Sequence, residues 1–207
     1  MITAAHSWHV LPLETPAGNN APMSDAAPAD DILVRATLAG DEPAYAELVQ
    51  RHKGRVLGTC SRFARDTQQL DDLSQEVFLR AWRKLGSFRG DAPFEHWLAR
   101  LTITTCYDFL RRERRHRGQV SLDEFPLEMR DAGIDAAIRA GHARELLDWA
   151  MRRLSAEEQL VVTLLEIEER TVREIAAQTG WSESNVKVRA YRARGRLKEI
   201  LNRKNEH

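Results

Sequence analysis

Apolar residues recur every three or four positions over most of this chain, which is the spacing that places them on one face of an α-helix. We find no segment with the strict alternation typical of a strand, and no internal repeat. The pattern therefore predicts an all-α protein. The expected helices cover residues 31–39, 41–63, 66–86, 93–115, 144–153, 156–167 and, as a closely spaced pair, 171–201.

Polar residues at the predicted helix ends support these boundaries. Asp66 can cap the helix that follows it. Ser155 with Glu158, and Thr171 with Glu174, match the capping box, in which two side chains reciprocally satisfy free backbone N–H groups. These signals place helix starts at the points where the apolar period begins.

The segment 171–201 is typical of a helix-turn-helix. Gly180 can end the first helix abruptly because glycine tolerates positive φ, and Ser182 can cap the second helix. Ala176 and Val186 provide a small residue at the crossing and an aliphatic residue that locks the second helix. Residues 181–204 hold eight Lys and Arg against two Glu. A second helix that is this basic is a candidate for the DNA major groove.

Charge divides the chain, although the 31 cationic and 31 anionic side chains of its 207 residues cancel. Residues 117–142 are acidic, weakly periodic and contain Gly and Pro, so we expect a flexible linker there. Residues 1–29 show no period and are expected to form a disordered leader. The predicted fold is thus two small helical domains, 30–116 and 143–202, joined by a flexible acidic linker, with the helix-turn-helix in the second.

Several function classes find no support. Cys60 and Cys106 match neither a disulfide framework nor a metal motif, so we expect reduced, partly buried thiols, with a redox switch as the alternative. The seven histidines are scattered, and no phosphate loop or nucleophile elbow occurs, so we expect no catalytic site, metal or cofactor. No apolar run approaches the ~20 residues of a membrane span. The expectation is a soluble cytoplasmic protein.

The segment 88–117 combines aromatic and basic side chains. Rings beside cations suit single-stranded DNA, whose unstacked bases dock on aromatic side chains. For Phe94 and Trp97, packing in the core is an equally good interpretation, because both follow the helical period. A solvated helix end is the alternative for the arginines at 111–117.

The predicted helix 66–86 has a polar face with an apolar edge. Asp72, Gln75, Glu76 and Leu79 fall on one side of it. Such a face can bind a helix of another protein, although composition alone favours a plain solvated surface.

Three segments then occur together in a recognisable order: DDLSQEVFLRAWRKLGSFRG at 71–90, PFEHWLARLTITTCYDFLRRERR at 93–115 and LSAEEQLVVTLLEIEERTVREIAAQTGWSESNVKVRAYRARGRL at 154–197. From about residue 30 to 201 the chain resembles the extracytoplasmic-function (ECF) type of the σ70 family of bacterial RNA polymerase σ factors. The segments resemble, in turn, the helix that binds core polymerase, the helix for the −10 element and the domain for the −35 element. The resemblance implies a σ factor that binds core polymerase, recognises both promoter elements and promotes DNA opening.

The resemblance also implies which residues make each contact. Those for polymerase are Asp71, Asp72, Gln75, Glu76, Phe78 and Trp82. Those for the −10 strand are Phe88, Arg89, Gly90, Asp91, Trp97, Arg100, Thr104, Asp108, Arg111 and Arg112. Those for the −35 duplex are Trp181, Ser182, Ser184, Asn185, Lys187, Arg189 and Arg192. The implied partners are core RNA polymerase, through the β′ clamp helices and the β subunit, promoter DNA and an anti-σ factor.

The chain departs from the family pattern near the −10 residues. Thr104 stands where many members have Asn, and Thr105 and Tyr107 stand where aliphatic residues are usual. The base preference at −10 is therefore not transferable. The rival hypothesis is a DNA-binding regulator that uses only its helix-turn-helix, with residues 30–116 as a sensor or dimerisation domain. That half shows no phosphoacceptor pattern and no ligand-pocket signature.

Overall fold

The computed structural model describes residues 29–117 and 136–205, and these residues are helical with short connections. Two predicted segments lie largely outside the described residues. These are the leader, apart from its last residue, and positions 118–135 of the linker. The N-terminal unit comprises α1 (Asp30–Leu38), α2 (Glu42–Cys60), α3 (Thr67–Lys84), the 3₁₀ turn η1 (Leu85–Ser87) and α4 (Phe94–Arg117). The C-terminal unit comprises α5 (Ala136–Met151), α6 (Ala156–Val162), the π-helical turn η2 (Thr163–Ile167), α7 (Val172–Thr179) and α8 (Glu183–Asn205).

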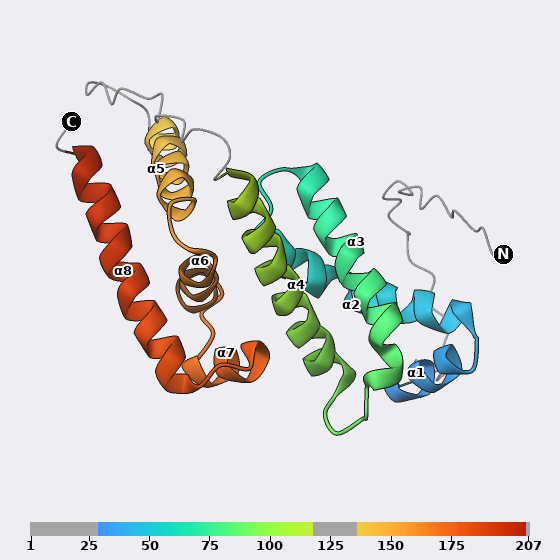
Figure 1. Ribbon diagram of the computed structural model, residues 1–207. Coiled ribbons are helices and arrows are strands. Elements are labelled where there is room, and N and C mark those ends of the chain that lie inside the picture. Colours follow the sequence, from blue (N-terminus) through green and yellow to red (C-terminus); the bar gives the residue numbers. More distant parts are fainter. Residues whose placement is uncertain (1–28, 118–135, 206–207) are drawn as a thin grey trace.

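Helix α4 lies at the centre of the molecule (Figure 1). On one side it packs against α2 and α3, with α1 beside α2. On its other side it packs against α6 and α7, and α8 in turn packs against α6 and α7. The two predicted helical domains are present, and they pack directly against each other through α4.

One hydrophobic core runs through both units. Buried residues of the N-terminal unit, such as Val77 and Leu98, belong to the same cluster as Leu160, Leu164 and Ile175 of the C-terminal unit. We call this cluster the shared core. A second, smaller cluster joins α5 and α6 to α8. Apolar burial, at about 25 cal/mol per Å², thus stabilises the contact between the units as well as each unit.

The predicted helix starts are confirmed in atomic detail. The Asp66 carboxylate accepts a hydrogen bond of 2.7 Å from the Gln69 backbone N–H. Both capping boxes form, at Ser155 and at Thr171. Gly180 ends α7 in the left-handed conformation, with φ 77°.

The main differences from the predicted helices lie in the C-terminal unit. Helix α5 begins at residue 136 rather than 144, because 136–143 are mostly good helix formers that extend the helix despite a glycine. Helix α8 continues to Asn205, four residues beyond the predicted end at 201. The predicted helix 156–167 has its full length, but its last turn widens to a π-helix.

The two cysteines are fully buried rather than partly buried, and both thiols are free. The Cys60 thiol beside it, together with burial, raises the pKa of the Cys106 thiol. Because both side chains are fully buried, neither cysteine is exposed to oxidants in this conformation.

Candidate polymerase- and DNA-binding surfaces

The solvent face of α3 carries the residues predicted to bind polymerase. Asp71, Asp72 and Gln75 are exposed. Beside them, Leu79 and Trp82 are 44% and 43% exposed, so two large apolar side chains are open to water next to the polar residues. The combination is a polar face with an apolar edge, as the sequence predicts.

The other predicted residues of this face contact α3 itself, the shared core or α2. Glu76 accepts a 2.6 Å bond from Arg80, and Phe78 is half-buried against the shared core. The Tyr45 hydroxyl donates to the Phe78 carbonyl oxygen at 2.5 Å, and its ring meets Trp82 edge-on at 4.8 Å. Burial raises the pKa of Tyr45, so the phenol stays protonated and keeps donating. No signal in the sequence links Tyr45 to Trp82.

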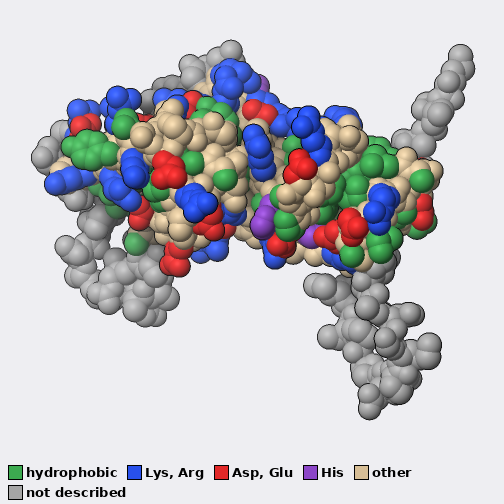
Figure 2. Space-filling view, turned by 90° about the horizontal axis from the view of Figure 1, so that it is seen from below, with side chains coloured by type: hydrophobic (Ala, Val, Ile, Leu, Met, Phe, Trp, Pro, Cys, Tyr) green, Lys and Arg blue, Asp and Glu red, His purple; other side chains and the backbone are tan. Residues whose placement is uncertain are grey.

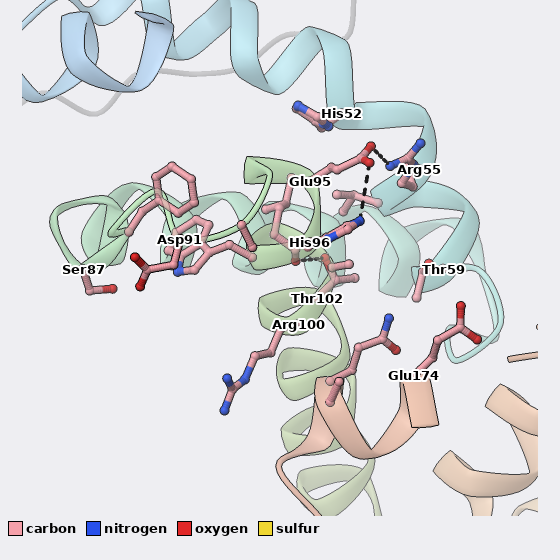
Figure 3. Close-up of a pocket in the computed structure, with 18 of the residues that line it drawn as sticks. His52, Arg55, Thr59, Ser87, Asp91, Glu95, His96, Arg100, Thr102 and Glu174 are labelled. Atoms are coloured by element: carbon pink, nitrogen blue, oxygen red, sulfur yellow. Dashed lines mark hydrogen bonds and ion pairs between the residues drawn. The ribbon is translucent and has the colours of Figure 1, made fainter. Parts of the chain in front are cut away.

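The loop after α3 and the start of α4 line a cavity of about 740 Å³. Figure 3 shows its labelled side chains, with Ser87 and Asp91 from the loop, Glu95, His96 and Arg100 from α4, and Glu174 from α7. Gly90 has φ 78°, so the loop uses glycine to turn at this point.

The aromatic residues of this region divide between core and cavity. Phe94 is 4% exposed, so the core interpretation is confirmed for it. Trp97 and Phe88 are half-buried, line the cavity and pack on each other, with ring centroids 5.7 Å apart. Arg89 is exposed at the loop. A ring face beside a cation is the arrangement on which an unstacked base can dock.

Further along α4, the predicted −10 residues have different surroundings. Arg100 and Thr104 are exposed, and the Thr104 hydroxyl donates to the Arg100 carbonyl at 2.5 Å. Asp108 pairs with Arg80 of α3 at 2.6 Å. Arg111 lies over the Tyr107 ring, at 5.7 Å from its centre. Of the same set, Arg112 is half-buried.

The residues predicted for the −35 element gather at the start of α8. Ser182 caps the helix by accepting from the Asn185 N–H at 3.2 Å. Ser184, Lys187 and Arg192 are exposed. The side chains of Asn185 and Arg189 are bonded to each other, because the Arg189 Nε donates to the Asn185 Oδ1 at 2.5 Å.

Trp181 and Arg189 form a stacked pair. The guanidinium of Arg189 lies 4.3 Å from the centre of the Trp181 ring. Since Nε is engaged by Asn185, the two terminal nitrogens remain as the fork that matches the O6 and N7 atoms of guanine. Stacking restricts the arginine rotamers, so the fork is oriented before any ligand arrives.

Charge is unequally distributed over the surface. Figure 2 shows Lys and Arg side chains spread over the end that carries α8, whereas acidic and hydrophobic side chains gather at the end that carries α1. The basic end suits a polyanion. Within 29–117 and 136–205, no group of His, Cys, Asp or Glu is arranged to hold a metal ion. No helix of these residues is long and apolar enough to span a bilayer.

The chain is similar to known proteins over most of its length. Sigma-70 region 2 matches residues 48–116, and Sigma-70 region 4 matches residues 144–197. The ECF RNA polymerase sigma factor SigM of Mycobacterium tuberculosis is 32% identical over 83% of this chain and 84% of its own length. The ECF RNA polymerase sigma-E factor of Escherichia coli is 28% identical over 80% of this chain and 90% of its own length.

A solved structure has the same fold. CnrH, determined in complex with the cytosolic domain of CnrY, aligns with a TM-score of 0.53 and 27% identity, over 84% of this chain and 98% of CnrH. Both sigma-70 regions are matched in order, and SigM is 32% identical over most of both chains. This chain therefore belongs to the ECF sigma factors of the sigma-70 family, which recognise promoters for RNA polymerase.

Proposed function

We propose that this chain binds core RNA polymerase through the solvent face of α3. The observation that carries the proposal is the exposure of Trp82 and Leu79 beside Asp72 and Gln75, on a helix whose opposite face is fully packed. Large apolar side chains left in water next to carboxylates are typical of a surface that becomes buried by a partner helix. The β′ clamp helices and the β subunit of the polymerase are the proposed partners. Because that enzyme works in the cytoplasm, the proposal also places the chain there.

The two DNA surfaces divide the promoter between them. We propose that the loop 88–92 and the exposed side chains of α4 take the opened −10 strand, with Arg111 and Arg112 near its phosphates. Helix α8 reads the −35 duplex, with Arg189 on guanine and Arg192 on phosphate. On this proposal residues 30–116 and 143–202 are the two functional domains, and 117–142 connect them.

We further propose an anti-σ factor as a third partner. CnrH, which shares the fold, was solved in complex with the cytosolic domain of CnrY. The basic face of α8 and the exposed edge of α3 are the surfaces such a partner would cover.

Promoter-dependent initiation with purified core polymerase tests the proposal. Asp72→Arg should abolish core binding and initiation while the circular dichroism stays that of the wild type, because Asp72 is exposed. Glu145→Arg is the matched control, since it is the same charge reversal on an exposed residue of α5. Normal core affinity in Asp72→Arg would refute the placement of the interface. Failure of the wild-type protein to bind core, while it binds duplex DNA alone, would refute the function.

A further inference from the structure

An ion pair joins the helix proposed to bind polymerase to the helix proposed to bind the −10 strand. Helices α3 and α4 pack side by side (Figure 1). From α3, the Arg80 Nη1 donates to the Asp108 Oδ2 of α4 at 2.6 Å. The Nε of the same guanidinium donates to Glu76, one turn earlier on α3, at 2.6 Å. Glu76 thus restricts the rotamers of Arg80 and holds its guanidinium in one orientation.

The surroundings of Arg80 keep it charged and paired. Its side chain is 21% exposed, against 39% for Asp108, so the pair is partly shielded from water and salt. Burial by itself lowers the pKa of Arg80, but the bonds to Asp108 and Glu76 raise it above its ordinary value. The guanidinium therefore neutralises the Asp108 carboxylate throughout the physiological pH range.

Asp108 is the acidic member of the α4 residues predicted for the −10 strand. Residues four positions apart on an α-helix lie on the same face, so Asp108 shares its face with Thr104 and Arg112. A carboxylate in that row repels a phosphate chain unless it is neutralised. It could also pair with a cation of its own helix, because Asp and Arg at positions i and i+4 attract each other.

The structure shows a different pairing. Arg111 and Arg112 lie three and four positions beyond Asp108, yet among residues 29–117 and 136–205 its ion pair is with Arg80. Arg111 lies over the Tyr107 ring, which leaves its charge unneutralised. Neither Arg111 nor Arg112 forms an ion pair with any residue that the structure describes. The charge of both arginines is therefore available to an anion.

We propose that Arg80 is a positioning residue of the −10 surface: by holding Asp108, it keeps that carboxylate from Arg111 and Arg112 and leaves both cations to the phosphates of the opened strand. Asp108 then supports the surface through Arg80 and reads no base, which differs from the direct contact that the family resemblance implies. The inference rests on the proposed function, because it needs α4 to meet the opened strand.

The two partners of the pair respond to substitution in opposite ways. Arg80→Ala releases Asp108, which then pairs with Arg112 or repels the strand, so affinity for single-stranded DNA should fall about threefold to fivefold, as for the loss of one exposed ion pair. Asp108→Asn removes the carboxylate itself, so affinity should stay at or above that of the wild type. For the same reason, the double variant should return to within about twofold of the wild type.

The measurement uses the holoenzyme reconstituted from core polymerase and the full chain, with the chain in excess so that every polymerase carries it. Fluorescence anisotropy gives the dissociation constant for a short single-stranded DNA of mixed sequence, because phosphate contacts carry no base specificity. Titrations at several salt concentrations count the contacts, since each phosphate neutralised on a single strand adds about −0.7 to the slope of log K against log[salt]. We expect Arg80→Ala to have a slope shallower by about 0.7, and the double variant to have the wild-type slope.

Two further variants keep the test decisive. Arg80→Met retains most of the side-chain volume and the helix propensity but has neither charge nor donor, so it should reproduce Arg80→Ala even if the alanine variant folds poorly. Arg83→Ala is the matched control, because it removes an exposed arginine of the same helix that forms no ion pair with the described residues. It should leave affinity and slope unchanged.

Three results would overturn the proposal. The first is an affinity and slope of the wild type in both Arg80→Ala and Arg80→Met. The second is a double variant as weak as Arg80→Ala, which would mean that Arg80 contacts the strand itself or that the pair only stabilises the fold. The third is a loss of affinity in Asp108→Asn alone, which would make Asp108 a direct contact of the strand.

The proposed function fails in a different way from this inference. Core binding and initiation are measured on the same proteins. If the wild-type chain initiates but Arg80→Ala binds the strand normally, the role of Arg80 is wrong and the σ proposal stands. If the wild-type chain does not bind core polymerase, the σ proposal is wrong, and the inference that rests on it falls too.

Discussion

Gly180→Ala is a substitution whose cost follows directly from the structure. Gly180 lies between α7 and α8 with φ 77°, in the left-handed region. A Cβ there would meet only the end of the Arg100 side chain, at 3.8 Å, which is an ordinary contact. Sterically the site accepts alanine, so the whole cost is that of holding an L-residue at positive φ.

The magnitude combines two opposed terms. The left-handed conformation costs a non-glycine residue about 1–2 kcal/mol. Loss of glycine from the unfolded chain returns about 0.4–1 kcal/mol, because alanine has fewer conformations to lose on folding. The net expectation is a destabilisation of about 1 kcal/mol.

Gly195→Ala is the matched control with the opposite sign. Gly195 lies within α8, and no heavy atom comes within 4 Å of a Cβ built there. Alanine in an exposed helix interior is favoured over glycine by about 0.5–1 kcal/mol. The same chemical change should therefore stabilise at 195 and destabilise at 180.

Thermal unfolding followed by circular dichroism tests the pair. For a folded region of this size, 1 kcal/mol corresponds to a shift of about 2–4 °C in Tm. We expect Tm to fall for Gly180→Ala and to rise for Gly195→Ala. An unchanged or raised Tm in Gly180→Ala would show that the turn relaxes to negative φ and that the strain argument is wrong.

Three further outcomes are expected. In the holoenzyme, Arg189→Lys should lose about 1–3 kcal/mol of discrimination between guanine and other bases at −35, because lysine lacks the planar fork of arginine. Competition binding measures this discrimination, and an undiminished value would exclude Arg189 as a residue that reads a base. Leu164→Ala, in the shared core, should lower the free energy of unfolding by about 2–5 kcal/mol, and tryptophan fluorescence and circular dichroism should still report one denaturation transition; separate transitions would contradict a shared core. Hydrogen bonds from the Thr171 hydroxyl and backbone hold the pKa of Glu174 below its usual 4.5. The carboxylate therefore stabilises the fold above about pH 4.5, and this stabilisation is lost as the pH falls through the lower pKa of the folded protein. The difference in Tm between the wild type and Glu174→Gln should then shrink on acidification. A difference in Tm that stays constant would refute the cap as its cause.

Local features of this fold could be predicted because they depend on neighbours in sequence. The caps at Asp66, Ser155 and Thr171 and the turn at Gly180 each rest on residues no more than four positions apart. The start of α5 was predicted late, because Gly141 and the acidic stretch before it suggested a linker. Glycine costs a helix only about 1 kcal/mol, and neighbouring residues offset that.

The environment of the candidate site residues depends on the tertiary fold and could not be read from the sequence. Asp108 is a predicted −10 residue that here pairs with Arg80, a residue of another helix. Phe94 and Trp97 share the same helical period and both contact the Phe88 ring, yet Phe94 is in the core and Trp97 lines the cavity. Periodicity indicates which residues turn inward, but not which neighbour they meet.

The contact between the units contains a hydrogen bond, from Tyr107 to Glu157, whose two partners both have shifted pKa values. Burial raises the pKa of Tyr107 to about 12, so the phenol donates to Glu157 throughout the physiological range. Although partial burial opposes ionisation of Glu157, the bond from Tyr107 and the charge of Arg189 hold the pKa of that carboxyl below its usual value. Glu157 is thus a charged acceptor at the contact between the units, bonded to Tyr107 and within the electrostatic influence of Arg189. The bond between Tyr107 and Glu157 therefore keeps one direction over the physiological pH range, with the phenol as donor and the carboxylate as acceptor.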